Sequence, residues 1–346
     1  MVIVHIIFSF LRGGTESMLV DIMNEQVKTE KVSLIIINNL FNQELLDSIH
    51  KDVRIIRLNR IPGSRNISAF IKLYYHLLKI SPQIIHCHDV NIVKMLFLTK
   101  AKLCFTLHNV QSQLSDIKKY DKVFAVSNAV KEYIKEQAGI EAQVIYNGIF
   151  PDLIEKKKSL SPGSPFRIIQ IGRLDKEIKG QDLLIQAISA VIKRGYDTEL
   201  YLVGKGKSYD YLKKTAGELG IEKKVFFLGE KSRSEIYANL YKYDLLVQPS
   251  LFEGFGLTII EAMAAHVPVL VSNLAGPMEV INDGECGDYF EAGNPTDLTV
   301  KIENIINGAL TENIEKTEKA SERVNTCFNI AHSAQCYLKS YNDLIR

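Results

Sequence analysis

The stretch from Pro249 to Pro268, PSLFEGFGLTIIEAMAAHVP, decides the fold of this 346-residue chain. It follows a short apolar run, Leu245–Gln248, that is typical of a buried strand, and its second half has the composition of a helix. The glycines of the turn, Gly254 and Gly256, let backbone N–H groups approach a ligand closely. We expect a helix to begin at about Leu257, with its free N–H groups and positive dipole end favouring a phosphate.

Two carboxylates accompany this turn, Glu253 within it and Glu261 in the second turn of the expected helix. Because helical side chains lean toward the helix N-terminus, Glu261 is expected to point back toward the turn. Ionised carboxylates accept hydrogen bonds from the paired hydroxyls of a sugar or ribose. Phosphate and hydroxyls in one pocket indicate a sugar nucleotide. The competing interpretation is an ordinary strand–helix turn with two solvated glutamates.

Length and composition bound the class of protein. A chain of 346 residues favours two domains, and 46% apolar with 24% charged residues is ordinary for a soluble protein. No apolar run is long enough to span a bilayer, and Val2–Phe10 resembles a first buried strand more than a signal peptide. Five cysteines without metal-ligand spacing favour reduced thiols and a cytoplasmic location. A net charge of only +2 argues against nucleic acid as the main partner.

Charge is unevenly distributed along the chain. Residues 1–150 carry a net charge of about +5 and residues 151–346 about −3. Arg54, Arg57, Arg60 and Arg65 precede an apolar helical pattern at residues 67–80. Such a patch can meet anionic lipid at the inner face of the cytoplasmic membrane, or a diphosphate-bearing acceptor. The competing interpretation is a solvated basic face.

Short β-branched runs alternate with helical patterns throughout, which is typical of parallel βαβ units. The expected strands of the first half are 2–8, 32–37, 54–58, 84–87, 103–107 and 123–126, and its helices are 17–27, 68–79 and 128–137. The expected strands of the second half are 167–172, 199–203, 225–228, 245–248 and 269–271. The expected helices of the second half are 180–194, 208–219, 232–241, 257–265, 296–307 and 330–345.

We therefore predict an α/β protein with two Rossmann-like, doubly wound domains. The expected division is a first domain at 1–150, a polar linker at 151–165, a second domain at 166–325, and a C-terminal helix within 326–346 that packs back on the first domain. Ligands of such sheets bind beyond the carboxyl ends of the strands.

Two loops carry further candidate groups. Arg173 and Lys179 lie in one strand–helix loop, where a planar guanidinium and a point charge can both reach a diphosphate. Gly13 and Gly14 follow the first strand and allow backbone N–H groups to close over a phosphate. Each loop is also compatible with a plain turn, with solvated cations in the first case.

Histidines end two of the expected strands. His86-Cys87-His88-Asp89 ends one, and His108 ends a later one. We reject a metal site at His86-Cys87-His88, because adjacent side chains alternate across a strand and the sequence offers no fourth ligand nearby.

The Glu253–seven residues–Glu261 pattern resembles the motif of the family-4 retaining glycosyltransferases. Arg173 with Lys179, the Gly13-Gly14 loop and His108 match further motifs of that family, and the resemblance covers nearly the whole chain. It implies a GT-B architecture with two Rossmann-like domains facing a cleft. The chain departs from the family at His266, which stands where a Gly usually ends the helix. That position calls for a left-handed backbone.

The resemblance also implies an activity, in which a sugar moves from a nucleotide diphosphate sugar, UDP- or GDP-linked, to an acceptor hydroxyl with retention and without a metal or other cofactor. The implied catalytic residues are His108, Glu253, Arg173 and Lys179. The implied donor-binding residues are Gly13, Gly14, Arg173, Lys179, Gly204, Glu230, Lys231, Glu253, Gly254, Phe255, Gly256, Leu257, Thr258 and Glu261. The acceptor side is assigned to His88, Asp89, Arg54 and Arg57.

Many relatives of this type build bacterial surface polysaccharides or glycolipids on a lipid carrier, so the implied acceptor is a glycan or lipid-linked glycan. Two alternatives remain open. One is a sugar-nucleotide epimerase of similar two-domain build, against which the Glu253/Glu261 pair argues. The other is a non-catalytic nucleotide-sugar-binding protein, against which the presence of Arg173, Lys179 and Glu253 argues.

Overall fold

The computed structural model describes residues 1–64, 67–110, 113–160, 163–308 and 310–346. These form two compact units, one made of Met1–Ile149 with Asn329–Arg346, and the other of Phe150–Phe328. The segment 151–165, predicted as a linker, falls within the second unit. Arg65 of the predicted basic patch lies outside the described residues.

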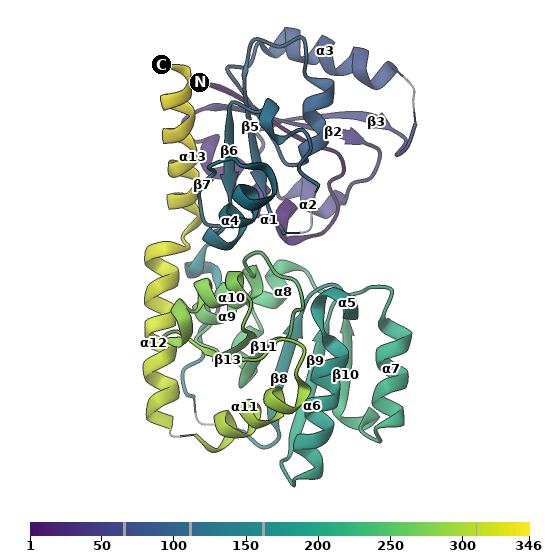
Figure 1. The fold of residues 1–346 in the computed structure, drawn as a ribbon, viewed down its shortest axis with the longest axis vertical. Helices are drawn as coiled ribbons and strands as arrows, with labels where there is room; N and C mark the ends of the chain where they lie inside the picture. Colours follow the sequence, from purple (N-terminus) through teal and green to yellow (C-terminus); the bar gives the residue numbers. More distant parts are fainter. Residues whose placement is uncertain (65–66, 111–112, 161–162, 309) are drawn as a thin grey trace. The chain divides into compact units, whose positions relative to one another are not determined.

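The first unit is built on a seven-stranded parallel sheet of order β3-β2-β1-β4-β5-β6-β7 (Figure 1). Its strands are β1 (Val2–Ile7), β2 (Lys31–Asn38), β3 (Arg54–Arg60), β4 (Ile84–Cys87), β5 (Lys102–Leu107), β6 (Lys122–Ala125) and β7 (Gln143–Val144). Most strand residues are buried, because helices cover both faces of a parallel sheet.

The helices of the first unit are α1 (Gly14–Gln26), α2 (Gln43–Asp47), α3 (Ser68–Ile80), α4 (Asn128–Ala138) and α13 (Ile330–Ile345). The last of these, α13, is the predicted C-terminal helix, and it packs against α1. Its fully buried Tyr341 is among the largest side chains of the core. Gly148 makes room for this helix, since a Cβ there would lie 2.7 Å from Ile330 Cα.

The second unit is built on a six-stranded parallel sheet of order β10-β9-β8-β11-β12-β13. Its strands are β8 (Phe166–Ile171), β9 (Thr198–Val203), β10 (Val225–Gly229), β11 (Leu245–Gln248), β12 (Val269–Ser272) and β13 (Asp288–Phe290). In each sheet the first strand along the chain is central, the next two strands lie on one side of it, and the remaining strands lie on the other side. This is the doubly wound order of a Rossmann-like domain, so the predicted fold class is confirmed.

The helices of the second unit are α5 (Lys176–Lys179), α6 (Gln181–Lys193), α7 (Tyr209–Glu218), α8 (Arg233–Tyr237), α9 (Leu257–Ala264), α10 (Ala275–Val280), α11 (Pro295–Asn307) and α12 (Leu310–Cys327). Two predictions were wrong here. The helix predicted at 232–241 ends at Tyr237 and is followed by a separate turn, η5 (Leu240–Lys242). The long helix α12 had not been predicted.

Strand order decides where ligands can bind. In both sheets the chain reverses direction between the first strand and the fourth, β1 and β4 in one unit, β8 and β11 in the other. Helices leave opposite faces at this switch point, so the loops beyond the strand ends border a crevice. Most of the candidate residues follow these four strands, whereas His108, Gly204, Glu230 and Lys231 follow the neighbouring strands β5, β9 and β10.

Candidate functional site

The loop after β8 holds the two predicted cations of the second unit. Arg173 is exposed, and its nearest carboxylate is Asp175, with Nη2 and Oδ2 3.9 Å apart. The carbonyl of Arg173 accepts a hydrogen bond from Gln181 Nε2 at 2.9 Å, which fixes the loop to α6. Lys179 closes the short helix α5 and is mostly buried. The loop therefore presents one exposed guanidinium and one anchored ammonium.

Gly180 brings this loop against the loop after β11. Its φ of +62° is left-handed, and a Cβ there would lie 2.0 Å from the Pro249 carbonyl oxygen, so only glycine fits. The close approach lets Lys179 Nζ reach Glu253 Oε2 at 2.7 Å. Two residues predicted to share one ligand thus form an ion pair with each other, 74 positions apart in sequence.

Glu253 is held by a second donor as well. Gln248 Nε2 donates to Glu253 Oε2 at 3.2 Å and to Ser250 Oγ at 3.0 Å, while its Oε1 accepts from Thr258 at 3.3 Å. The last residue of β11 therefore orients both the carboxylate of the turn and the first turn of α9. With only 14% of its side chain exposed, Glu253 is a preorganised acceptor rather than a solvated charge.

The predicted helix start is confirmed. Gly256, with φ of +105°, precedes α9, which begins at Leu257, and Glu261 lies half-buried in its second turn. Gly254 of the same turn is buried. Gly276 of α10 approaches it so closely that a Cβ on Gly276 would lie 2.6 Å from the Gly254 carbonyl oxygen. Phe255 is only 2% exposed and packs edge-on against Phe328, so its side chain belongs to the core and only its backbone can face a ligand.

The loops after β9 and β10 border the same end of the sheet. Gly204, with φ of +139°, approaches so closely that a Cβ would meet the Gly172 carbonyl oxygen at 2.0 Å. Glu230 is exposed and lies 3.8 Å from Lys205, whereas Lys231 pairs with Glu235 at 3.1 Å. Lys231 also lines a cavity of about 280 Å³ under α8, whose walls are mainly apolar.

In the first unit, α1 begins at Gly14, three residues before the predicted start at Ser17, and Gly13 is its N-cap. The carboxyl of Glu16 lies over Gly13, and burial, helped by the nearby Asp89, raises its pKa to about 7. Asp89 follows β4 and accepts a hydrogen bond from the Phe8 amide at 3.0 Å, while burial raises its pKa. Glu16 and Asp89 therefore form a partly desolvated carboxyl pair at the switch point of this sheet.

Histidines gather on the face of the first sheet that α1 and α13 cover. The register pairs His5 of β1 with His86 of β4, and the nitrogens of His5, His86 and His88 lie within 4.8 Å of one another. Cys87 alternates to the other side, as expected for a strand. The sequence analysis missed His5, because its proximity to His86 depends on which strands pair.

The imidazole nitrogens of these three histidines hydrogen-bond to the protein. His86 contacts Tyr341 and Thr106, His5 contacts Gln26 and His88, and His88 reaches on to His108. Burial lowers the pKa of His5 and His108 to about 4, and those of His86 and His88 well below the ordinary value. All four rings are therefore neutral at pH 7, and hydrogen bonding accounts for their arrangement.

The predicted basic patch lies beside an exposed apolar stripe. Arg54 and Arg57 of β3 are exposed, and Arg57 also lies over the ring of Phe41 at 4.9 Å. The solvent side of α3 and its N-terminal flank carry Ile67, Ile71, Tyr75 and Leu78, which are 70%, 61%, 52% and 76% exposed. Phe97 and Leu98, 68% and 69% exposed, adjoin this helix through the ring of Phe70 and the hydroxyl of Tyr74. We call these six residues the α3 stripe.

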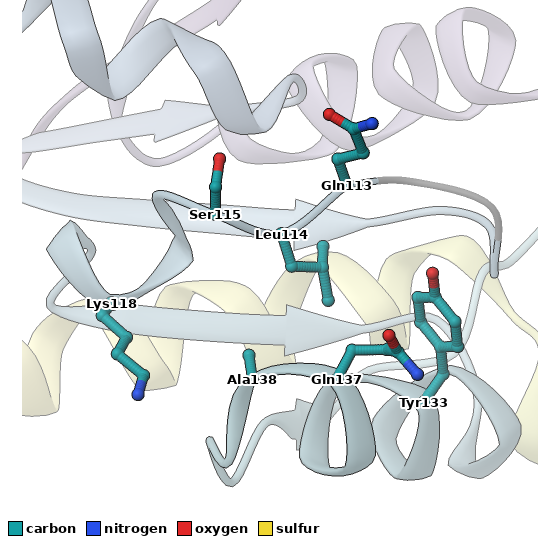
Figure 2. A pocket seen from close by; sticks show the side chains of 7 residues that line it. All are labelled: Gln113, Leu114, Ser115, Lys118, Tyr133, Gln137 and Ala138. Atoms are coloured by element: carbon teal, nitrogen blue, oxygen red, sulfur yellow. The ribbon is translucent and has the colours of Figure 1, made fainter.

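A second cavity, of about 450 Å³, lies between the segment 113–118 and α4 (Figure 2). Tyr133, Gln137 and Ala138 of the helix form one wall, and Leu114 and Lys118 lie on the other side (Figure 2). It contains none of the predicted site residues, so cavity size alone does not find the site. Among the helices that the structure describes, none combines the length and the apolar character of a membrane-spanning segment.

Two family models match this chain. The model described as glycosyl transferases group 1 matches residues 152–324, and the model described as Glycosyltransferase Family 4 matches residues 12–153. Together they span residues 12–324, which include most of both units.

Curated relatives are similar to the chain over part of their length. An uncharacterized glycosyltransferase of Methanocaldococcus jannaschii is 32% identical over 57% of this chain and 52% of its own length. A lipopolysaccharide 1,6-galactosyltransferase of Salmonella typhimurium is 26% identical over 74% of this chain and 73% of its own. The chain thus spans about half the length of the first of these.

Solved structures share the fold along the whole chain. A glycosyltransferase from Rickettsia africae superimposes with a TM-score of 0.84 and 22% identity over 100% of this chain and 98% of its own. The Anabaena protein HepE, solved with UDP and glucose, gives a TM-score of 0.85 and 22% identity over 99% of both chains. At this level of identity the likeness shows the fold.

Proposed function

This chain belongs to the group 1 and family 4 glycosyltransferases, and from that premise we propose that it moves a sugar from a nucleotide diphosphate sugar to an acceptor hydroxyl with retention at the anomeric carbon. The observation that carries the proposal is the interlocked pair of loops after β8 and β11, where Lys179 holds Glu253. An ammonium group beside a carboxylate suits a ligand that has both phosphates and hydroxyls, because the ammonium donates to phosphate and the carboxylate accepts from hydroxyls.

The proposed roles follow from the geometry of the second unit. Arg173 is exposed and meets the leaving diphosphate, and Lys179 adds a second positive charge. Glu253, oriented by Gln248, accepts hydrogen bonds from the sugar hydroxyls. Glu261 of α9 accepts from the ribose, and the free N–H groups at the start of α9 face a phosphate. The resemblance adds His108 as a contact of the transferred sugar.

We also propose that the sugar transfer requires no metal ion. Arg173, Lys179 and the positive end of α9 are three sources of positive charge beside one leaving group, and charge neutralisation of this kind replaces the role of magnesium. In retaining transfer of this type, the leaving phosphate takes the proton of the acceptor hydroxyl as the new glycosidic bond forms. No protein base is then required beside the anomeric carbon.

UDP-sugars are the first donors to test, because HepE was solved with UDP-glucose and with UDP and glucose. The acceptor proposed is a glycan or lipid-linked glycan of the bacterial surface. Support for this comes from the lipopolysaccharide galactosyltransferase of Salmonella among the relatives and from the α3 stripe.

The α3 stripe supports peripheral contact with an anionic bilayer. Its members Ile71, Tyr75 and Leu78 lie nearly opposite the buried Ala69, Leu73 and Leu77 of the same helix, so they face away from the core. The sequence contains no Asp or Glu between Asp52 and Asp89, whereas basic residues recur throughout that span. An apolar stripe flanked only by basic charge is typical of a helix that lies in the membrane interface.

Substitution of the phosphate-binding pair tests the transferase proposal. Arg173→Ala and Lys179→Ala should each lower donor turnover by about two orders of magnitude, since each removes a charge-assisted contact worth on the order of 2.7–4 kcal/mol in the transition state. Arg167→Ala, which removes an exposed arginine of β8 outside the loop, is the matched control and should leave turnover unchanged. Activity that EDTA abolishes and magnesium restores would contradict the metal-independent mechanism.

A further inference from the structure

A chain of hydrogen bonds runs from the end of α1 to His108 in the first unit. Gln26 Oε1 lies 2.8 Å from His5 Nε2, and His5 Nδ1 lies 3.1 Å from His88 Nε2. His88 Nδ1 lies 3.3 Å from His108 Nε2. His5 and Gln26 are fully buried and His88 is 9% exposed, so water does not compete along most of this chain.

Neutral imidazoles in such a chain cannot choose their tautomers independently. Each ring carries one N–H, and each contact between two nitrogens needs one donor and one acceptor. The Gln26 oxygen only accepts, so His5 must be protonated at Nε2 and must accept at Nδ1. His88 is then protonated at Nε2 and accepts at Nδ1, and the same holds for His108. Every ring in the chain becomes the Nε2–H tautomer.

Two buried atoms of this hydrogen-bond chain have no partner among the described residues, Gln26 Nε2 at one end and His108 Nδ1 at the other. His108 Nδ1 is buried and makes no hydrogen bond to any described residue. A buried acceptor without a partner destabilises the folded protein, because it has lost its hydrogen bonds to water. In an enzyme such an atom is expected to find its partner in the substrate.

We propose that Gln26, His5 and His88 are positioning residues that fix His108 as a hydrogen-bond acceptor at Nδ1, and that this atom accepts a hydrogen bond from a hydroxyl of the transferred sugar. The second half of this inference rests on the proposed transferase function. It makes His108 a specificity determinant, because a donor sugar lacking that hydroxyl leaves the acceptor unsatisfied. It also assigns a role to Gln26, which lies three contacts away from His108 and a fourth from the proposed sugar.

The tautomers can be measured without any donor. Protein labelled with ¹⁵N in the imidazole rings, studied by long-range ¹H–¹⁵N correlation at pH 7.5, should show His5, His88 and His108 as Nε2–H tautomers, with single His→Gln variants used for assignment. His108 protonated at Nδ1, or as an imidazolium, overturns the inference whatever the activity. That result would follow if the Gln26 amide presented its nitrogen to His5.

Variants test whether Gln26 sets the tautomer. Gln26→Leu removes the acceptor, so His108 should become a mixture of tautomers and kcat/KM for the donor should fall about tenfold or more. Gln26→Glu keeps an acceptor and should restore the Nε2–H pattern. Thr106→Val is the matched control, because it removes a buried hydrogen bond to His86 in the same cluster without touching the chain to His108. An unchanged His108 tautomer in Gln26→Leu overturns the role of Gln26.

Deoxy donor sugars test the contact itself. One deoxy analogue should lose about tenfold in kcat/KM with the wild-type protein and almost nothing with His108→Phe, because both changes remove the same hydrogen bond. Equal losses for all deoxy analogues in both proteins overturn the sugar contact. If the wild-type protein turns over no nucleotide sugar while its tautomers are as expected, the proposed function and the sugar contact fail and the positioning chain stands.

Discussion

At the scale of single residues, the two glutamates of the turn and helix have different neighbours, and we propose different roles for them. Glu253 is fixed by Lys179 and Gln248, whereas Glu261 lies a helical turn above, on α9. Glu253→Gln should reduce turnover more than nucleotide binding, because Glu253 is assigned to the sugar. Glu261→Gln should weaken binding of the nucleoside diphosphate itself. Calorimetric titration with UDP separates the two, and equal affinity of both variants would show that Glu261 does not contact the ribose.

Glu16 gives a pH-dependent prediction. Burial raises the pKa of its carboxyl from 4.5 to about 7, so the folded state binds the proton more tightly than the unfolded state. The stabilisation from the neutral acid is complete below about pH 4.5 and is lost as pH rises toward 7. Glu16→Gln keeps the neutral form, so relative to wild type the free energy of unfolding should gain up to about 3 kcal/mol between pH 4.5 and pH 8.

Urea denaturation of both proteins at pH 4.5 and pH 8 measures that difference. Glu44→Gln, at an exposed glutamate of α2 in the same unit, is the control and should show little change with pH. A Glu16→Gln effect of the same size at both values would mean that the carboxyl is not desolvated in the folded protein.

The strand pattern places Lys179 near Glu253, but it does not predict how the two side chains meet. The carboxyl ends of β8 and β11 are adjacent in a doubly wound sheet, so Arg173, Lys179 and Glu253 could be placed together from the strand pattern alone. The ion pair between Lys179 and Glu253 depends on the close approach of Gly180 to Pro249, which has no signature in sequence. His5 was missed for a similar reason, since only the pairing of β1 with β4 brings it to His86.

At the scale of elements, the end of α9 shows a departure from the family pattern that the structure accommodates. His266 follows the helix with φ of +57°, so the predicted left-handed backbone is confirmed. Its ring lies 3.0 Å from Ser321 Oγ of α12, a contact that glycine lacks. The side chain offsets part of the backbone strain by joining two helices.

Substitutions at this position separate the two effects. His266→Gly and His266→Ala both lose the contact with Ser321, but only alanine keeps the left-handed strain, so it should be less stable than glycine by about 1 kcal/mol. Ala265→Gly is the opposite control, because φ of −74° there is helical and glycine should destabilise. Thermal denaturation ranks the variants, and equal melting temperatures for His266→Ala and His266→Gly would contradict the strain.

The errors in predicting helices have physical causes. The sequence of α12, LTENIEKTEKASERVNTC, is mostly polar, so apolar periodicity is weak and the helix escapes a pattern search. The helix predicted at 232–241 breaks near Asn239, whose side-chain amide donates to the Glu235 carbonyl oxygen at 2.7 Å. Asn side chains that bond to backbone in this way favour turns over helix.

At the scale of the whole molecule, the α3 stripe predicts how the protein meets a bilayer. The chain should pellet with vesicles that contain phosphatidylglycerol at low salt, and pelleting should fall at high salt, because screening weakens charge attraction of about 1 kcal/mol per basic residue. The double variant Ile71→Ser/Leu78→Ser should abolish pelleting. Leu153→Ser, at an apolar residue of the second unit that is 66% exposed, is the matched control and should pellet like wild type.

Two further measurements complete the vesicle test, namely pelleting with neutral vesicles and the oligomeric state of the protein in solution. Equal, negligible pelleting with anionic and neutral vesicles at both salt concentrations would remove membrane contact, and with it much of the support for a lipid-linked acceptor. Concentration-dependent dimerisation that Ile71→Ser/Leu78→Ser abolishes would instead assign the α3 stripe to a second copy of the chain.

The central claim is that the protein consumes a nucleotide sugar and releases the sugar with its anomeric configuration retained. Real-time ¹H NMR of the purified protein with a panel of UDP- and GDP-sugars follows the donor anomeric proton directly, with water as acceptor when no glycan is supplied. We predict slow consumption of one α-linked donor, the α-sugar as the first product before mutarotation, and loss of the signal change with Arg173→Ala. No consumption of any donor, or the β-sugar as the first product, would contradict the account.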